Sequence, residues 1–518
     1  MIGKKINISP FSRTVLGCIL IGIAFSLCRY SMQPCTEAAM FHNNMLSFGQ
    51  DAPYQYYFMR VFAMLNHISA LVLKITGSLY LTDLSAGILV HIVTALALGL
   101  SCYALCRRSL PSILFAAVMI DYGLFYGGSP VYPIMNLTGE GSYGILGQSF
   151  LILTFALAGC GKFKYSAFCL GLMPFVHPTW SIFGAGVLLV TGLLEYRLLK
   201  KMFCRYYWYL FIGLAVSCAG LLLQFYWMRN IPPLTSESGF LMEKYIMNWS
   251  DHHQPIPFSD KTLWFAILAE LLVFGLGNYL FHVRPEKRLL LLLLGVSAIA
   301  GGIGIIITHG FLPSLTAALL PGRFCNLAAF LLPALAFGLL LSTRMSNRSI
   351  LLINVFLLVC LIFPSPYHTY RPSRQAWENL RGNTPGFWNT VAADRGMLLS
   401  GIWTPYIFRL SQRGVWLDIK VLNAFPMVPE ALPILERGLK ELYGISLTQK
   451  NPFFDDLNCK GRIHPSIFKE LWCSRSPQQW KILAEKYHFS GILVPADWPL
   501  KLKKTAENQD FAYYKLEI

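Results

Sequence analysis

Residues 84–128, LSAGILVHIVTALALGLSCYALCRRSLPSILFAAVMIDYGLFYGG, decide the fold class of this chain. Two apolar runs, 84–106 and 110–128, lie on either side of the basic pair Arg107-Arg108. Each run has about the length that an α-helix needs to cross a lipid bilayer. Short loops rich in Lys and Arg stay in the cytoplasm. The stretch therefore predicts a membrane hairpin whose turn faces the cytoplasm.

The other basic clusters extend this pattern along the whole chain. They are Lys4/Lys5/Arg13, Lys162/Lys164, Arg197/Lys200/Lys201/Arg205, Arg284/Lys287/Arg288 and Arg344/Arg348. If all clusters are cytoplasmic, an even number of crossings must separate each neighbouring pair, and the apolar segments supply that number every time. We predict eleven crossing helices, near 13–30, 84–106, 110–128, 143–160, 165–176, 178–196, 206–228, 262–282, 288–308, 323–343 and 349–365.

This topology predicts an α-helical polytopic protein of the cell inner (plasma) membrane, with a cytoplasmic N-terminus. The composition agrees, since 55% of the 518 residues are hydrophobic and only 13% are charged, too apolar for an ordinary soluble protein. The net charge of +17 reflects the cytoplasmic loops. We therefore expect the lipid bilayer, and not nucleic acid, as the partner of these basic residues.

Two regions are expected, a transmembrane region 1–365 and an extracytoplasmic α/β domain 366–518. The first contains a long external loop, 30–83, whose second half is apolar and amphipathic, as in helices that lie along a membrane surface. The second has ordinary globular composition. Its strand-like runs are 397–399, 415–417 and 491–494, and its helical patterns are 429–443, 465–473 and 477–487. A disulfide between Cys459 and Cys473 is left open.

Acidic residues outside the membrane are the first candidates for chemistry. Glu37 and Asp51 both lie in the first external loop, and Glu140 lies in the second external segment, 127–143. A carboxylate at the membrane–water boundary can activate a hydroxyl as a base or bind a divalent metal through its oxygens. We predict Asp51 and Glu37 as catalytic residues, with Asp51 preferred because aromatic residues and proline surround it. Glu140 is a candidate for substrate binding.

Cationic and imidazole groups are the second set of candidates. Asp251, His252 and His253 are consecutive in a long external loop, and histidine binds metals or phosphates through its ring nitrogens. Arg323 follows Pro321-Gly322 at the start of an apolar helix, where a guanidinium could bind a lipid-linked phosphate through two hydrogen bonds. His177 precedes Pro178 at the predicted external apex of the 165–196 hairpin. It is either a substrate ligand or a helix-end residue.

Taken together, these features resemble the GT-C superfamily of membrane glycosyltransferases, and in particular a group of bacterial multi-spanning proteins with that architecture. The matching elements are the first external loop with Asp51, a Gly-Gln-Ser-Phe helix that leads to His177-Pro178, the Asp251-His252-His253 loop and Pro321-Gly322-Arg323. Segments 408–415 (FRLSQRGV) and 491–495 (GILVP) are similar to the C-terminal region of that group. The resemblance covers nearly the whole chain in layout.

The resemblance implies transfer of a sugar from a polyprenyl-phosphate donor to a lipid or glycan acceptor of the cell envelope, on the extracytoplasmic face. It implies Asp51 as the base, Arg323 as the phosphate ligand, and His252 and His253 beside the donor phosphate. The chain departs from the family in lacking a paired Asp-Glu in the first loop, since Glu37 and Asp51 are fourteen residues apart. A divalent metal, Mg²⁺ or Mn²⁺, therefore stays open.

Three other functions remain open at this point. Asp121 and Glu270 fall within predicted spans, where carboxyl groups often line a transport path, so a transporter or flippase is the first alternative. A polymerase or ligase of lipid-linked polysaccharide is the second. A non-catalytic assembly protein with a degenerate site is the third.

Overall fold

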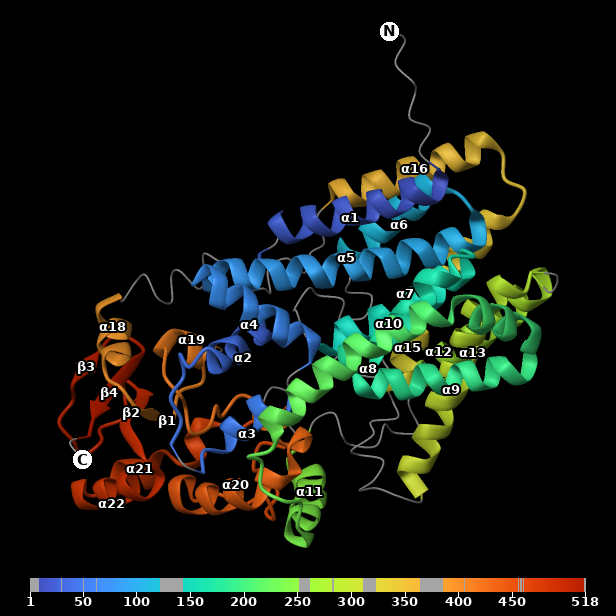
Figure 1. Cartoon of the computed structure of the whole chain (residues 1–518). Helices are drawn as coiled ribbons and strands as arrows, with labels where there is room; N and C mark the ends of the chain where they lie inside the picture. Colours follow the sequence, from blue (N-terminus) through green and yellow to red (C-terminus); the bar gives the residue numbers. More distant parts are fainter. Residues whose placement is uncertain are drawn as a thin grey trace.

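The fold was analysed on a computed structural model of the chain. It describes residues 9–28, 30–49, 51–61, 63–121, 143–250, 261–281, 284–310, 323–363, 385–404, 406–454, 456, 459 and 461–516. Long helices form a bundle at one end of the molecule, and a smaller unit with a β-sheet lies at the other end (Figure 1).

The bundle contains a helix at every one of the eleven segments predicted to cross the membrane. They are α1 (Pro10–Cys28), α5 (Leu79–Cys106), α6 (Ser109–Asp121), α7 (Tyr143–Gly159), α8 (Phe163–Val176), α9 (Pro178–Leu194), α10 (Tyr196–Met228), α12 (Lys261–Leu280), α13 (Pro285–Gly310), α15 (Arg323–Ser342) and α16 (Asn347–Ile362). Among the described residues, six helices are long and apolar enough to cross a membrane, and α6, α7, α8, α9 and α16 are shorter apolar helices. The number of crossings thus stays a prediction.

The break between helices α8 and α9 lies at His177, between Val176 and Pro178. We expected Pro174 and His177-Pro178 to interrupt it, but α8 continues through Pro174 and ends only at His177, whose backbone is extended (φ −163°, ψ 108°). Pro178 then begins α9, where its missing N–H is not needed. Further along, α8 and α10 pack closely because Gly171 and Gly213 face each other's backbones.

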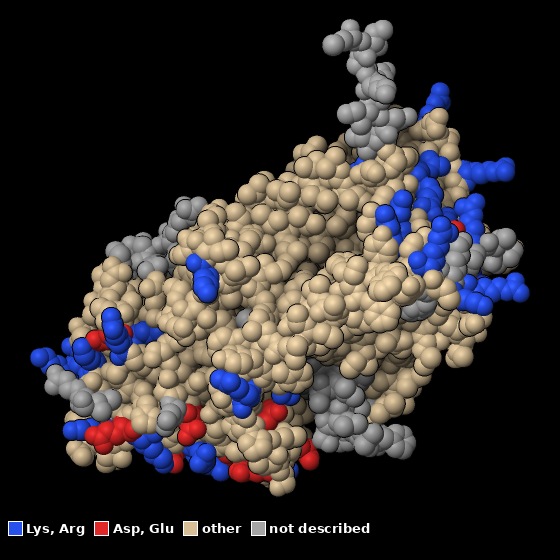
Figure 2. Space-filling model, in the orientation of Figure 1, with Lys and Arg blue, Asp and Glu red and all other residues tan. Residues whose placement is uncertain are grey.

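Basic residues gather at the end of the bundle that lies away from the β-sheet unit (Figure 2). Their loops also contact one another there. Lys287 Nζ donates to the carbonyl oxygen of Leu105 at 2.8 Å, and Arg288 forms an ion pair with Glu195. The clusters that we placed on one side of the membrane are therefore also neighbours in space, as the topology requires. That this end faces the cytoplasm stays a prediction.

The unit at the opposite end is built on a four-stranded sheet of order β1-β2-β4-β3. The strands are β1 (Met397–Ser400), β2 (Phe489–Pro495), β3 (Ala506–Glu507) and β4 (Phe511–Lys515), and β1 runs parallel to β2 while the other pairs are antiparallel. Around it lie α18 (Pro385–Ala393), α19 (Ile407–Ser411), α20 (Leu432–Gly438), α21 (Lys469–Ser474), α22 (Pro477–Tyr487), the 3₁₀ turns Leu422–Met427, Pro429–Ala431 and Pro465–Ile467, and the π-turn Leu439–Tyr443.

The expected mixture of helices and strands is therefore present, with differences in detail. The run 415–417 was predicted as a strand, but it joins the sheet only through one bridge between Leu398 and Val415. Strand β4 was not expected. It lies between β2 and β3, and its residues Ala512 and Tyr513 are buried. Cys459 and Cys473 are both free thiols.

Segments from the first region complete the core of this unit. They are α2 (Pro34–His42), α3 (Pro53–Arg60) and α11 (Ser236–Asn248), which share one hydrophobic core with residues 387–514. Tyr54 of α3 is buried against Phe408 and Phe425. Helix α4 (Met64–Thr76) follows at an angle of 103° to α3. In the second half of the 30–83 loop, which we expected along the membrane surface, Phe58 also packs on Phe408, whereas Leu71 and Ile75 of α4 are exposed, so that placement stays a prediction. The boundary at 365/366 stays a prediction.

Candidate functional site

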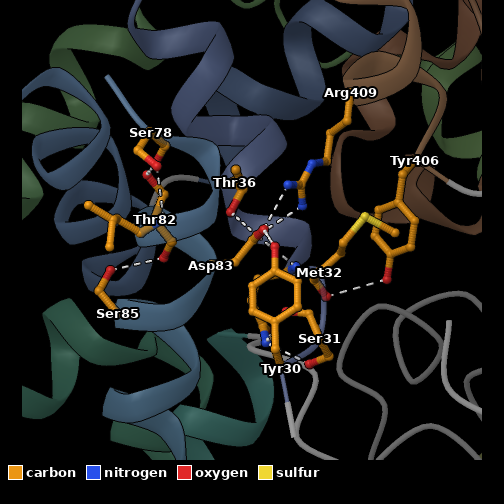
Figure 3. Close-up of polar contacts among 12 residues, drawn as sticks. Tyr30, Ser31, Met32, Thr36, Ser78, Thr82, Asp83, Ser85, Tyr406 and Arg409 are labelled. Carbon is orange, nitrogen blue, oxygen red and sulfur yellow. Dashed lines mark hydrogen bonds and ion pairs between the residues drawn. The ribbon is translucent and has the colours of Figure 1, made fainter. Parts of the chain in front are cut away.

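A buried ion pair joins the bundle to the β-sheet unit (Figure 3). Arg409 of α19 donates from Nη1 and Nη2 to the two carboxylate oxygens of Asp83, at 2.9 and 2.7 Å. Asp83 lies in the first turns of α5, and both side chains are fully buried, at 0% and 1% exposure. Two parallel N–H···O bonds of this kind also fix the orientation of both partners.

Three further groups, from two residues just before α2 and one in its first turn, donate hydrogen bonds to Asp83. The hydroxyl of Tyr30 donates to Oδ2 at 2.5 Å, and the backbone N–H of Gln33 and the hydroxyl of Thr36 donate to Oδ1 at 3.0 and 2.6 Å. A buried carboxylate needs such partners to offset its desolvation. The pair therefore fixes the start of α2 relative to α5 and α19.

Glu37 follows Thr36 directly and lies in the first turn of α2. Its side chain is only partly exposed, and its Oε1 atom is buried without a hydrogen-bond partner among the described residues. Burial and then the negative charge of Asp418 raise the pKa of Glu37 to about 8, while the cation of Arg409 opposes that rise. Glu37 is thus a carboxyl group that is mostly protonated at neutral pH and titrates just above it.

Asp418 is the neighbour whose charge acts most strongly on Glu37. It is 4% exposed, and its Oδ1 accepts the backbone N–H of Lys420 at 2.9 Å, a turn in which aspartate is common. Burial raises the pKa of Asp418 to about 6, although this hydrogen bond and the cations of Lys420 and Arg462 oppose the rise. At neutral pH the pair therefore holds one ionised carboxylate, on Asp418, and one mostly protonated carboxyl, on Glu37.

Tyr143 joins His177 to the β-sheet unit. It is the first residue of α7, and its hydroxyl donates to Met427 Sδ at 2.7 Å. Its ring stacks on His177 with 5.4 Å between centroids. Burial, then the charge of Tyr143 and then that of Glu37 raise the pKa of Tyr57 in α3.

His177 also caps a helix, which is the second of the two roles predicted for it from the sequence. Its Nδ1 accepts the backbone N–H of Trp180 at 3.4 Å, at the N-terminus of α9. A neutral ring that accepts at Nδ1 carries its proton on Nε2. The side chain is buried, at 4% exposure, so the capping bond and the Tyr143 stack fix the orientation of its Nε2–H.

Asp51 has different surroundings from Glu37. It is exposed and has a left-handed backbone (φ 61°) just before α3, a conformation that aspartate tolerates better than most residues. Its clearest partner is Tyr56, whose pKa is raised first by burial and then by the charge and hydrogen bond of Asp51. The structure therefore brings Glu37, and not Asp51, beside other ionisable groups at the junction of the two units.

The other predicted site residues cannot be placed in the same way. Asp251, His252, His253 and Glu140 lie outside the described residues. Arg323 is the first residue of α15, and its side chain lies outside them as well. Their roles stay predictions.

The two intramembrane carboxyl residues behind the transporter alternative are both buried. Asp121 is the last residue of α6. Glu270 is in α12, and neither of its carboxyl oxygens has a hydrogen-bond partner among the described residues.

Three residues of this arrangement were missed in the sequence. Asp83 ends the first external loop, Arg409 lies in the 408–415 segment to which no role was given, and Asp418 directly follows the run 415–417. A charged residue at the edge of an apolar stretch is a weak signal, because most such residues are solvated. Only the tertiary fold shows that Asp83 and Arg409, 326 positions apart, are partners.

The donor set was also tested as a metal site. Across the described ranges, no group of three or more His, Cys, Asp and Glu side chains is placed to hold a metal ion. Glu37 and Asp418 would supply two carboxylates, and Mg²⁺ is commonly held by one or two carboxylates together with water and substrate phosphate. Metal dependence therefore stays open, and the steps proposed below use only the side chains of the protein.

No family model matches the chain, and no curated protein matches its sequence. Among solved structures, it is similar to the oligosaccharyltransferase of Archaeoglobus fulgidus in the apo form, with 11% identity, a TM-score of 0.42, and coverage of 95% of this chain and 70% of that one. Similarity at this level does not by itself establish a shared activity.

Proposed function

We propose that the protein is a membrane glycosyltransferase that moves a sugar from a polyprenyl-phosphate donor to a cell-envelope acceptor at the outer end of the bundle. The observation that carries this proposal is Glu37, a carboxyl group with a buried oxygen that lacks a partner among the described residues. Its pKa of about 8 suits a general base near neutral pH. The GT-C resemblance of the sequence supports the same class of reaction.

In the proposed reaction, ionised Glu37 accepts the proton of the acceptor hydroxyl. The acceptor oxygen forms a bond to C1 of the donor sugar, and the bond from C1 to the phosphate oxygen breaks. The lipid phosphate leaves with the electron pair and needs no added proton, because it is a stable anion. Asp418 does not touch the acceptor in this scheme. It acts as a positioning residue that makes Glu37 a stronger base.

The donor phosphate requires positive charge at the outer membrane boundary. Arg323, His252 and His253 remain our proposed ligands for it, since guanidinium and imidazole groups suit phosphate oxygens. Arg409 is less suited to that role, because both terminal nitrogens of its guanidinium donate to Asp83. The prenyl tail would lie between membrane helices.

The test is transfer of a radiolabelled sugar from polyprenyl-phosphate donors by the purified full-length protein. Glu37→Gln keeps the shape of the side chain and removes the base, so transfer is expected to fall by about 10²–10⁴-fold. The matched control is Glu485→Gln, at an exposed glutamate of α22, which should transfer like the wild type.

The variants Asp51→Asn and Arg323→Ala separate our two assignments of the base and test the phosphate ligand. Loss of transfer in Asp51→Asn with normal transfer in Glu37→Gln would return the base to Asp51 and contradict the role of Glu37. Absence of transfer by the wild type with every polyprenyl-phosphate sugar offered would contradict the proposed function.

A further inference from the structure

A second polar cluster lies next to Asp418 in the β-sheet unit. Ile463 N–H donates to the carbonyl oxygen of Ile419 at 2.8 Å, which brings the 462–464 segment beside the 418–420 segment. Lys420 and His464 therefore lie on adjacent stretches of backbone. Both side chains are partly exposed, as is Trp403 in the loop after β1.

Trp403 lies beside both Lys420 and His464. The Lys420 ammonium is 5.9 Å from the centroid of the Trp403 ring, and the His464 ring is 5.3 Å from it. Phe453 packs on the other side of His464, with 4.7 Å between centroids. A partly exposed indole offers an apolar face on which the carbon–hydrogen face of a sugar ring can pack.

The polar atoms around this ring are donors. Lys420 Nζ lies over the Trp403 ring and forms no ion pair within hydrogen-bond distance with a carboxylate of the described residues. His464 Nδ1 accepts the backbone N–H of Ser466 at 3.3 Å, so its neutral ring keeps the proton on Nε2 as a donor. Burial lowers the pKa of Lys420 most, and the positive charge of Arg462 in the 462–464 segment lowers it further, while the charge of Asp418 opposes both.

We propose that Trp403, Lys420 and His464 form a subsite that binds an acidic sugar of the acceptor glycan, beside Asp418. This proposal rests on the glycosyltransferase function proposed above and names the acceptor class. An aromatic face with two cationic or hydrogen-bond donors at its edge matches a pyranose ring that carries a carboxylate. A neutral sugar would use the aromatic face alone, whereas a sugar carboxylate would also pair with the Lys420 ammonium, whose charged neighbours among the described residues are Arg462 and Asp418.

The subsite belongs to the β-sheet unit, since Trp403, Lys420 and His464 all lie in that part of the chain. Asn451 N–H donates to Asn248 O at 3.1 Å and Gly461 N–H donates to Trp249 O at 2.7 Å, so Asn451 and Gly461 are held at the end of α11. The phosphate of a prenyl-linked donor is tied to the membrane surface by its lipid, whereas an acceptor glycan can extend across this unit.

The test is binding of three probes to the full-length protein in lipid nanodiscs, measured by isothermal titration calorimetry: methyl β-glucuronide, methyl β-glucoside and glucose 1-phosphate. We expect the glucuronide to bind about tenfold more tightly than the glucoside, because one charge-assisted hydrogen bond accounts for a difference of that order. Lys420→Gln should abolish this preference. Lys481→Gln, at an exposed lysine of α22, is the matched control and should retain it.

Trp403 provides a second, independent check. Trp403→Ala should weaken the binding of both methyl glycosides, and Trp403→Phe, which keeps an aromatic face and is less disruptive to folding, should retain most of it. Thermal unfolding of each variant shows whether it is folded. Equal affinity for glucuronide and glucoside, or a preference that survives Lys420→Gln, would overturn the subsite.

The probes also separate this proposal from the proposed function. Tighter binding of glucose 1-phosphate than of the glucuronide would assign the cluster to the donor phosphate and overturn the acceptor subsite. Selective glucuronide binding by a protein that transfers no sugar would support an acidic-glycan site and contradict the transferase. Transfer without any preference for acidic acceptors would leave the transferase in place and overturn the subsite alone.

Discussion

Two carboxyl groups at the junction of the two units have opposite surroundings, although Thr36, a ligand of one, directly precedes the other. Asp83 accepts hydrogen bonds from Tyr30, Gln33, Thr36 and, twice, from Arg409. Glu37 has a buried oxygen with no partner among the described residues. The comparison separates a carboxylate that holds the structure together from a carboxyl that is available for chemistry.

The difference follows from the cost of burying charge. A carboxylate with paired donors stays ionised and stabilises one arrangement of its partners. A buried carboxyl without donors, and with a second carboxylate nearby, binds its proton more tightly, and such shifted groups concentrate at functional sites. Asp83 is thus expected to matter for folding, and Glu37 for activity.

The largest expected effect is the loss of sugar transfer in Glu37→Gln, by about 10²–10⁴-fold, because general-base catalysis contributes that much. Its unfolding temperature should stay at or above that of the wild type, since no hydrogen bond to Oε1 is lost. Transfer assays and thermal unfolding on the same preparations check both parts. Normal transfer by the variant, or a loss of activity caused only by unfolding, would contradict the claim that Glu37 acts in catalysis while Asp83 acts in stability.

The next largest effect is on stability. Arg409→Ala leaves the Asp83 carboxylate buried without its cation, which is expected to cost about 3–5 kcal/mol. Thermal or denaturant unfolding measures it. The control is Lys469→Ala, which removes an exposed ion pair with Asp497 and should change stability by only about 0–1 kcal/mol. Similar losses in the two variants would show that burial of the Asp83–Arg409 pair has no special role.

A smaller effect is expected at Asp418, which acts on Glu37 through its charge. Asp418→Asn can still accept the Lys420 N–H but removes the negative charge that raises the pKa of Glu37. The rising limb of the pH–rate profile should therefore move to lower pH. The matched control is Asp510→Asn, at an exposed aspartate. A limb that stays in place would mean that Asp418 does not tune Glu37.

A further test of the contrast between Glu37 and Asp83 is the pH dependence of stability. The pKa of Glu37 is raised in the folded protein from 4.5 to about 8, so the folded chain binds this proton more tightly than the unfolded chain between those values. Stability then falls as the pH rises through this window. Glu37→Gln should remove that part of the decline. The unfolding temperature of the variant minus that of the wild type should therefore increase from pH 5 to pH 8.5. Parallel curves for the two proteins would contradict the raised pKa.

Much of the layout could be predicted from the sequence, because it depends on local patterns. Apolar runs between basic loops gave helices at all eleven segments, and Pro477–Tyr487 became α22 with the bounds that were expected. A Ser476–Gln479 capping box marks the start of that helix. Such signals lie within a few residues of the feature they specify.

The site could be predicted only in part, because it depends on contacts between distant segments. Glu37 and His177 were chosen for their residue types and expected location. The preference for Asp51 over Glu37 rested on neighbouring aromatic residues, and these pack into the core of the β-sheet unit while Asp51 remains exposed. Asp418 approaches α2 because α2 packs in the core of the β-sheet unit and the Asp83–Arg409 pair joins that unit to α5, and no local pattern encodes these contacts.

The most direct test of the central claim is the pH–rate profile of sugar transfer between pH 6 and 9, for the wild type and Glu37→Gln. If Glu37 is the base, wild-type transfer rises with pH along a single limb with an apparent pKa of about 8, and the residual transfer of Glu37→Gln lacks that limb. A wild-type profile without such a limb, or the same limb in both proteins, would contradict the assignment of the base to Glu37.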